Sequence, residues 1–170
     1  MLIKKVEKIL NEQVEKEGYS SHLYLAMASW AETSGFKGIA GWLYAQAEEE
    51  RMHMLKLVHY INERDGKAVI PLIKLPPAKY AGISKLFDQV LEHEQYISAS
   101  INDIAGACIE QKDFTTHHWI QWFVNEQIQE EASVKEIIDK LKLVGNQNMY
   151  QFDRDILSMR TADAADTTPA

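Results

Sequence analysis

Four glutamates are spaced along the sequence so that their carboxylates could together bind a cation. Glu17, Glu50, Glu94 and Glu130 each interrupt a helical stripe of apolar residues, and His53 follows Glu50 by three positions. Residues three apart on a helix share a face, so Glu50 and His53 can reach one ligand. Carboxylate oxygens with one imidazole suit Fe(II), whereas zinc more often binds cysteine or several histidines. The residue types therefore indicate an iron site.

The elements that position these side chains are predicted to be four long helices, followed by a shorter amphipathic one. Helices of roughly 27–32 residues span ~40–48 Å at 1.5 Å per residue, a length typical of a four-helix bundle. No strand-like alternation occurs, so the expected fold is all-α. Ser84 is the expected N-cap of the third helix, and Thr115 or Thr116 that of the fourth. The predicted helices cover residues 2–33, 38–64, 83–111, 115–144 and 147–159.

The segment 66–82 is predicted to be one long crossover. It contains Pro71, Pro76, Pro77 and Gly82, which argue against a helix. Fully extended, it can reach ~56 Å, enough to cross the whole bundle. The third helix then runs parallel to the second, and the short turns elsewhere make two antiparallel hairpins.

A core-facing seam with steps of three and four residues runs along every long helix. In a bundle of equal helices the midpoints share one height, so the four glutamates should converge in one layer, with His53 and Gln127 beside them. The predicted seams are Ile3, Val6, Leu10, Gln13, Glu17, Ser20, Tyr24, Met27 and Ala31; Ile39, Leu43, Gln46, Glu50, His53, Leu57 and Tyr60; Ile83, Phe87, Val90, Glu94, Ile97, Ile101, Ile104 and Cys108; and Thr116, Ile120, Phe123, Gln127, Glu130, Val134, Ile137, Leu141 and Val144.

That layer contains no lysine or arginine at a seam position. Burying several carboxylates without a countercharge costs several kcal/mol per ion. The acids must therefore be protonated, or a cation must supply the missing charge. A single glutamate in a seam is more often a surface residue in the wrong register, but four interruptions at matching depth are hard to explain in that way.

Charge and composition exclude other classes of protein. The chain has 18 basic and 25 acidic residues, a net charge of −7, which argues against a nucleic-acid binder. No apolar run approaches the ~20 residues that span a membrane, and the N-terminus does not read as a signal peptide. Cys108 is the only cysteine, which suits a reducing cytoplasm. Residues 161–170 are small and polar, and we expect a disordered tail after a domain of residues 1–160.

Over residues 1–160 the sequence resembles bacterial non-haem ferritins. The resemblance implies a ferritin-like bundle with a di-iron ferroxidase centre, in which Glu17, Glu50 and His53 bind one iron, and Glu50, Glu94 and Glu130 bind the second. The residues that support it are Glu17 followed by YSSHLYLAMASW, the run AEEERMHM with Glu49, Glu50 and His53, then Glu94, and WFVNEQIQEE with Glu126, Gln127 and Glu130.

The same resemblance implies further roles around the centre. Gln127 would lie beside the iron pair, and Tyr24 would form a hydrogen bond nearby. Glu49 and Glu126, one residue off the seam, resemble with Glu130 a third iron site. A solvated helix face is the alternative interpretation of Glu49 and Glu126.

The implied function is iron storage and detoxification. Fe(II) would be oxidised by dioxygen or hydrogen peroxide, and ferric oxyhydroxide would be deposited inside a cage of 24 copies, with the fifth helix at the four-fold axes. Haem is not expected, for two reasons. Gln127 and Glu130 occupy the positions where haem-containing bacterioferritins have a second Glu-x-x-His. Arg51 occupies the position of their haem-binding methionine.

Two other functions are open at this stage. A non-storage di-iron enzyme on the same bundle is one, but it is expected to use a second histidine. A helical interaction module is the other, and it explains the bundle and the charge but not four acids at one height.

Overall fold

The chain folds into long helices with no strand among the residues that can be described. The computed structural model describes the backbone of residues 1–163 and their side chains except those of residues 146 and 160–163. Residues 164–170, most of the predicted disordered tail, lie outside the described part. The elements are α1 (Lys4–Thr33), α2 (Lys37–Glu63), α3 (Ile83–Glu110), α4 (Phe114–Val144), the 3-10 helix η1 (Asn146–Asn148) and α5 (Met149–Asp163).

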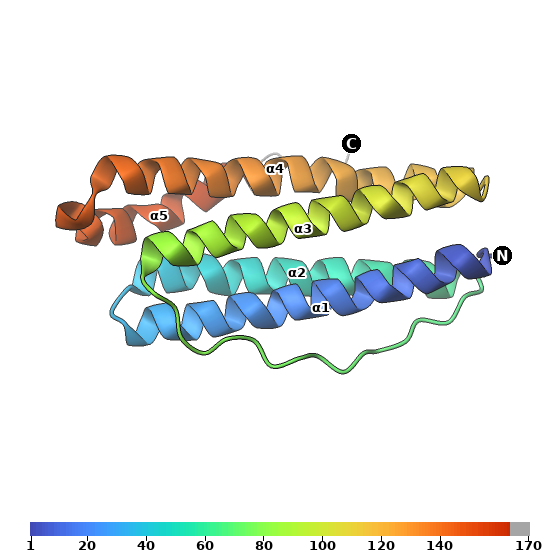
Figure 1. Ribbon diagram of the computed structural model, residues 1–170, viewed down its shortest axis with the longest axis horizontal. Helices are drawn as coiled ribbons and strands as arrows, with labels where there is room; N and C mark the ends of the chain where they lie inside the picture. The colour runs from blue at the N-terminus through green and yellow to red at the C-terminus, as the bar shows by residue number, and fades with distance from the viewer. Residues whose placement is uncertain (164–170) are drawn as a thin grey trace.

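The four long helices pack as a bundle of two antiparallel hairpins. α1 packs against α2, α3 against α4, and α1 also contacts α3. The crossover between α2 and α3 runs the length of the bundle, so α2 and α3 point in the same direction (Figure 1). The predicted all-α bundle with one long crossover and a short fifth helix is therefore confirmed. No helix in residues 1–163 is long and apolar enough to cross a membrane.

The seam residues form the core, as their periodicity predicts. All of them are buried except Ile3 and Val144, which are half-buried. The apolar members fall into two separate clusters. One includes Met27, Leu43 and Phe87, and the other includes Leu10 and Phe123. Since Glu17, Glu50, Glu94 and Glu130 fall between the two clusters in every helix, the core is divided at mid-height by a polar layer.

Two helix caps differ from the sequence expectation. The N-cap of α3 is Gly82, with φ of 120°, because Ile83 is already helical and Ser84 lies inside the first turn. The N-cap of α4 is Asp113, whose carboxylate accepts hydrogen bonds from Thr116 N at 3.1 Å and Thr116 Oγ1 at 2.7 Å. Thr116 thus donates to the cap and is not itself the capping residue, and Thr115 is not the cap either.

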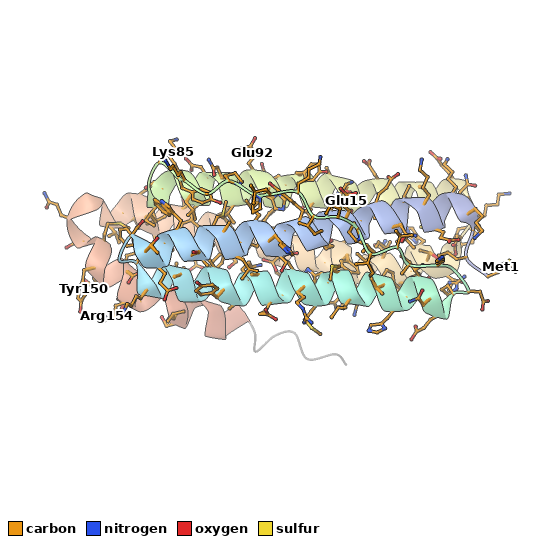
Figure 2. The ribbon with its side chains drawn as sticks, turned by 90° about the horizontal axis from the view of Figure 1, so that it is seen from below. Met1, Glu15, Lys85, Glu92, Tyr150 and Arg154 are labelled. Atoms are coloured by element: carbon orange, nitrogen blue, oxygen red, sulfur yellow. The ribbon has the colours of Figure 1, made fainter. Side chains whose placement is uncertain are left out.

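α5 folds back and supplies a cap to another helix. Asp153 accepts hydrogen bonds from the backbone of Gly38 at 3.1 Å and Ile39 at 2.8 Å, at the first turn of α2. A Cβ atom at Gly38 would lie 1.6 Å from the Asp153 carbonyl oxygen, so only glycine permits this approach. Tyr150 and Arg154 consequently lie at the end of the bundle opposite Met1 (Figure 2). Against the predicted 147–159, α5 begins two residues later and continues to Asp163.

We expect Asp113→Ala to destabilise the apo protein by about 1–2 kcal/mol, because it removes a buried cap from the first turn of α4. Chemical denaturation followed by circular dichroism measures the effect. Asp139→Ala is the matched control, because Asp139 is 71% exposed and pairs only on the surface with Lys142, and we expect a change within ~0.5 kcal/mol. Equal effects of the two substitutions would contradict the assignment of the cap.

Candidate metal centre

The polar layer gathers the predicted site residues from all four long helices. α1 contributes Glu17 and Tyr24, α2 contributes Glu50 and His53, α3 contributes Glu94, and α4 contributes Gln127 and Glu130. The four carboxylates are between 0% and 8% exposed. Acids of this burial are rare in proteins unless they are paired with a charge or bind a metal.

Glu17, Glu50 and His53 form the tightest group. Each offers a ligand atom within 4.8 Å of the others, and His53 Nδ1 lies 3.4 Å from Glu50 Oε2. Glu17 Oε2 is buried and has no hydrogen-bond partner among the residues that the structure describes. A buried carboxylate oxygen in that condition, next to a second carboxylate and an imidazole, fits a divalent cation.

The His53 ring is held in place by aromatic side chains of α4. The rings of Trp122 and Phe123 meet it edge-on, with centroids at 5.5 Å and 5.7 Å. A ligand whose orientation is set by packing loses little freedom when it binds a metal. Trp122 was not among the predicted site residues, although it lies in the WFVNEQIQEE run.

Glu94 and Glu130 are oriented by neutral donors. Tyr24 Oη donates to Glu94 Oε1, and Gln127 Nε2 donates to Glu94 Oε2 at 3.1 Å. Gln46 Nε2 donates to Glu130 Oε2 at 2.7 Å. Tyr24 and Gln127 therefore lie beside the carboxylates, where the sequence analysis expected them.

Burial and mutual repulsion make these carboxylates weak acids. Burial raises the pKa of Glu17 well above its usual range, and the charge of Glu50 raises it further. Burial likewise raises the pKa of Glu130, together with the charge of Glu94. The pKa of Glu94 rises to about 7, mainly through burial, against hydrogen bonds from Tyr24 and Gln127 that lower it. A bound cation would relieve the same repulsion that favours the protonated acids.

Glu49 and Glu126 form a second group with His53, closer to the surface. Ligand atoms of the three lie within 4.8 Å of one another, and both acids are half-buried. Burial raises the pKa of Glu126. Glu130 lies near enough for the Glu49 charge to raise its pKa. The structure thus groups Glu49 and Glu126 with His53, and Glu130 is linked to this group through the influence of the Glu49 charge.

Two glutamines at the centre had no role in the sequence analysis, although both occupy seam positions. Gln13 Nε2 donates to Glu17 Oε1 at 2.7 Å, and Gln46 donates to Glu130 as described. Each stands four residues before a predicted ligand of its own helix, Glu17 or Glu50. A seam amide one turn before a seam glutamate is the signal that could have identified them.

Comparison with known proteins gives consistent matches along nearly the whole chain. The bacterial non-heme ferritin of Campylobacter jejuni is 41% identical over 145 residues, covering 85% of this chain and 87% of that protein. A probable bacterial non-heme ferritin-like protein of Haemophilus influenzae is 38% identical over 163 residues, covering 95% and 99%. Among solved structures, the open pore ferritin of Archaeoglobus fulgidus superposes with a TM-score of 0.90 at 34% identity, covering 92% of this chain and 96% of that one.

The family match covers most of the bundle. The Ferritin-like domain family matches residues 7–144, from the first turns of α1 to the last residue of α4. That range contains every residue of the polar layer. By the helical bundle, the relatives and the matched domain, this chain belongs to the ferritin family.

Proposed function

We propose that this protein oxidises Fe(II) at the polar layer of each subunit and stores the resulting Fe(III) as a mineral. The observation that supports this most directly is the convergence of Glu17, Glu50, Glu94 and Glu130 with His53, inside a core that has no basic residue at a seam position of that layer. Such a site gains most from a substrate that is itself a cation.

One of the two proposed ligand sets matches a group of ligand atoms in the structure, and the other follows the resemblance to ferritins. One Fe(II) is bound by Glu17, Glu50 and His53, whose ligand atoms lie within 4.8 Å of one another. The second is bound by Glu94 and Glu130, with Glu50 shared between the two ions. Hydrogen bonds to Glu94 and Glu130 leave these carboxylates oriented before iron arrives, which lowers the cost of binding.

The chemistry follows from the charge of the ligands. Anionic oxygen ligands favour Fe(III) over Fe(II), so binding at the centre promotes oxidation. Two Fe(II) ions give two electrons to dioxygen, which takes up two protons and leaves as hydrogen peroxide; hydrogen peroxide can accept two electrons from a further pair. Fe(III) then hydrolyses to ferric oxyhydroxide and releases protons. The neutral amide of Gln127 adds no further anion, which suits a centre that passes its product on.

Glu49, Glu126 and Glu130 are proposed to form a third iron site. The half-buried position of Glu49 and Glu126 places them between the buried centre and the surface of the bundle. Iron leaving the centre on this side would meet carboxylates before it meets bulk water.

Storage needs a container, so the proposal includes a homo-oligomeric shell of 24 copies. The match to the open pore ferritin of Archaeoglobus fulgidus supports an assembly of that kind. A cytoplasmic location and the absence of haem belong to the same proposal.

Glu94→Ala is expected to abolish the fast phase of Fe(II) oxidation, because Glu94 is a proposed ligand with no exposure to solvent. The loss should exceed the ~10–100-fold cost of changing an outer partner of a metal ligand. Stopped-flow absorbance after aerobic addition of Fe(II) measures it. Glu92→Ala is the control, because Glu92 points away from the bundle on the same helix (Figure 2). An unchanged fast phase in Glu94→Ala would overturn the site assignment.

Glu17→Gln is expected to stabilise the apo protein as the pH rises. The pKa of Glu17 is raised in the folded state by burial and by the charge of Glu50, so the wild type loses stability as the pH rises above the pKa of the unfolded chain. A neutral amide escapes this loss, so the two proteins should be alike at pH 4 and diverge above it. Denaturant unfolding at several pH values measures the difference.

The same variant should lose its response to metal. At a Co(II) concentration of 100 times the dissociation constant, the wild type gains about 2.7 kcal/mol, and Glu17→Gln should gain much less. Glu15→Gln, on the exposed face of α1 (Figure 2), should behave as wild type in both measurements. A Glu17→Gln protein with full metal stabilisation would contradict the ligand role of Glu17.

A further inference from the structure

The buried carboxylate of Glu17 is connected to a lysine outside the polar layer. Glu17 Oε1 accepts a hydrogen bond from Gln13 Nε2 at 2.7 Å, and Gln13 Oε1 accepts one from Ser100 Oγ at 2.6 Å. Ser100 Oγ in turn accepts one from Lys16 Nζ. The line of contacts leaves α1, crosses to α3 and returns to α1, one residue before the carboxylate where it began.

The ammonium group sets the direction of every bond in this line. Lys16 has three donors and no acceptor, so Ser100 Oγ must accept from it. The single hydroxyl hydrogen of Ser100 is then left for Gln13 Oε1. Because the amide oxygen of Gln13 is engaged, its NH2 group faces Glu17. Hydrogen bonds ordered in one direction polarise one another, so the ammonium group of Lys16 strengthens the bond that Gln13 donates to Glu17.

Lys16 is itself held in a defined place. It is half-buried, and its ammonium lies 5.5 Å from the centroid of the Tyr96 ring. Tyr96 and Ser100 are one turn apart on α3, so both contacts of the ammonium come from one face of that helix. Lys16 and Tyr96 also line a pocket of about 550 Å³ between α1, α3 and the crossover.

The two oxygens of Glu17 consequently differ. Oε1 is held by Gln13, which is completely buried, whereas Oε2 has no hydrogen-bond partner among the described residues and belongs to the group with Glu50 and His53. When one oxygen of a carboxylate is fixed by a hydrogen bond, the side chain is restricted to one conformation. The other oxygen is then already oriented to bind a cation. No basic residue occupies a seam position of the layer, and this line of contacts connects Glu17 to Lys16, which lies outside the layer.

We infer that Gln13, Ser100 and Lys16 are positioning residues for Glu17, and that together they set the affinity of the Glu17–Glu50–His53 group for a divalent cation. This inference rests on the proposed function, since it takes Glu17 to be a metal ligand. It adds a determinant of metal affinity that lies outside the ligands, on the face of the bundle formed by α1 and α3.

Anaerobic titration with Co(II), followed by its visible d–d absorbance, tests the inference without any oxidation step. Gln13→Leu should weaken the tightest Co(II) binding about 10–100-fold, as expected for the outer partner of a metal ligand. Lys16→Met and Ser100→Ala should each weaken it roughly 3- to 10-fold, because the remaining amide is no longer oriented. Both should also alter the shape of the d–d band, which a substitution affecting stability alone does not change.

Two further comparisons separate the line of contacts from general effects. The double variant Lys16→Met/Ser100→Ala should bind Co(II) with no lower affinity than whichever single variant has the lower affinity, since both changes break the same line of hydrogen bonds. Ser100→Thr keeps the hydroxyl and should bind within about twofold of wild type. Lys8→Met removes an equally charged but 78% exposed side chain of α1 and should leave binding unchanged.

The inference is overturned if Lys16→Met and Ser100→Ala bind Co(II) as wild type does, if their effects multiply in the double variant, or if Lys8→Met weakens binding equally. Absence of Co(II) binding in the wild type would instead overturn the metal centre itself, and the inference with it. Normal wild-type binding with unaffected variants contradicts only the positioning role.

Discussion

The constraint on which this structure depends is the burial of four carboxylates at one height of the core. Burial disfavours their charged forms, and no basic residue at a seam position of the layer compensates them. The apolar core is consequently divided into two clusters, one on each side of the layer. Amide and hydroxyl donors from Gln13, Gln46, Tyr24 and Gln127 satisfy individual oxygens without cancelling the charge. The layer therefore favours either protonated acids or a bound cation, since each relieves the repulsion among the carboxylates.

The rest of the bundle keeps that layer assembled. The length of the crossover allows α3 to run parallel to α2, so the midpoints of all four helices meet (Figure 1). Asp113, directly before α4, caps that helix, and Asp153 of α5 caps the first turn of α2. Such caps resist fraying of the helix ends, and a helix that keeps its register keeps its glutamate at the height of the others.

Much of the fold and of the centre could be predicted because both follow helical periodicity. A glutamate at a seam position points inward regardless of its neighbours, so Glu17, Glu50, Glu94 and Glu130 could be placed in one layer by counting residues. The helix ends were less predictable, since capping depends on a side chain reaching a backbone donor. Asp113 takes that role before Thr115 or Thr116 can, and α3 begins at Ile83 without a side-chain cap, so Ser84 was misassigned.

The sequence by itself determined the helices, the crossover and the height at which acids enter the core, because these depend on spacing along one chain. Only the tertiary structure decided which oxygen meets which donor. Gln13 faces Glu17 because Ser100 of another helix engages its amide oxygen, and Ser100 does so because Lys16 donates to it. Contacts of this kind depend on rotamers and on the distance between packed helices, and residue spacing within one helix specifies neither.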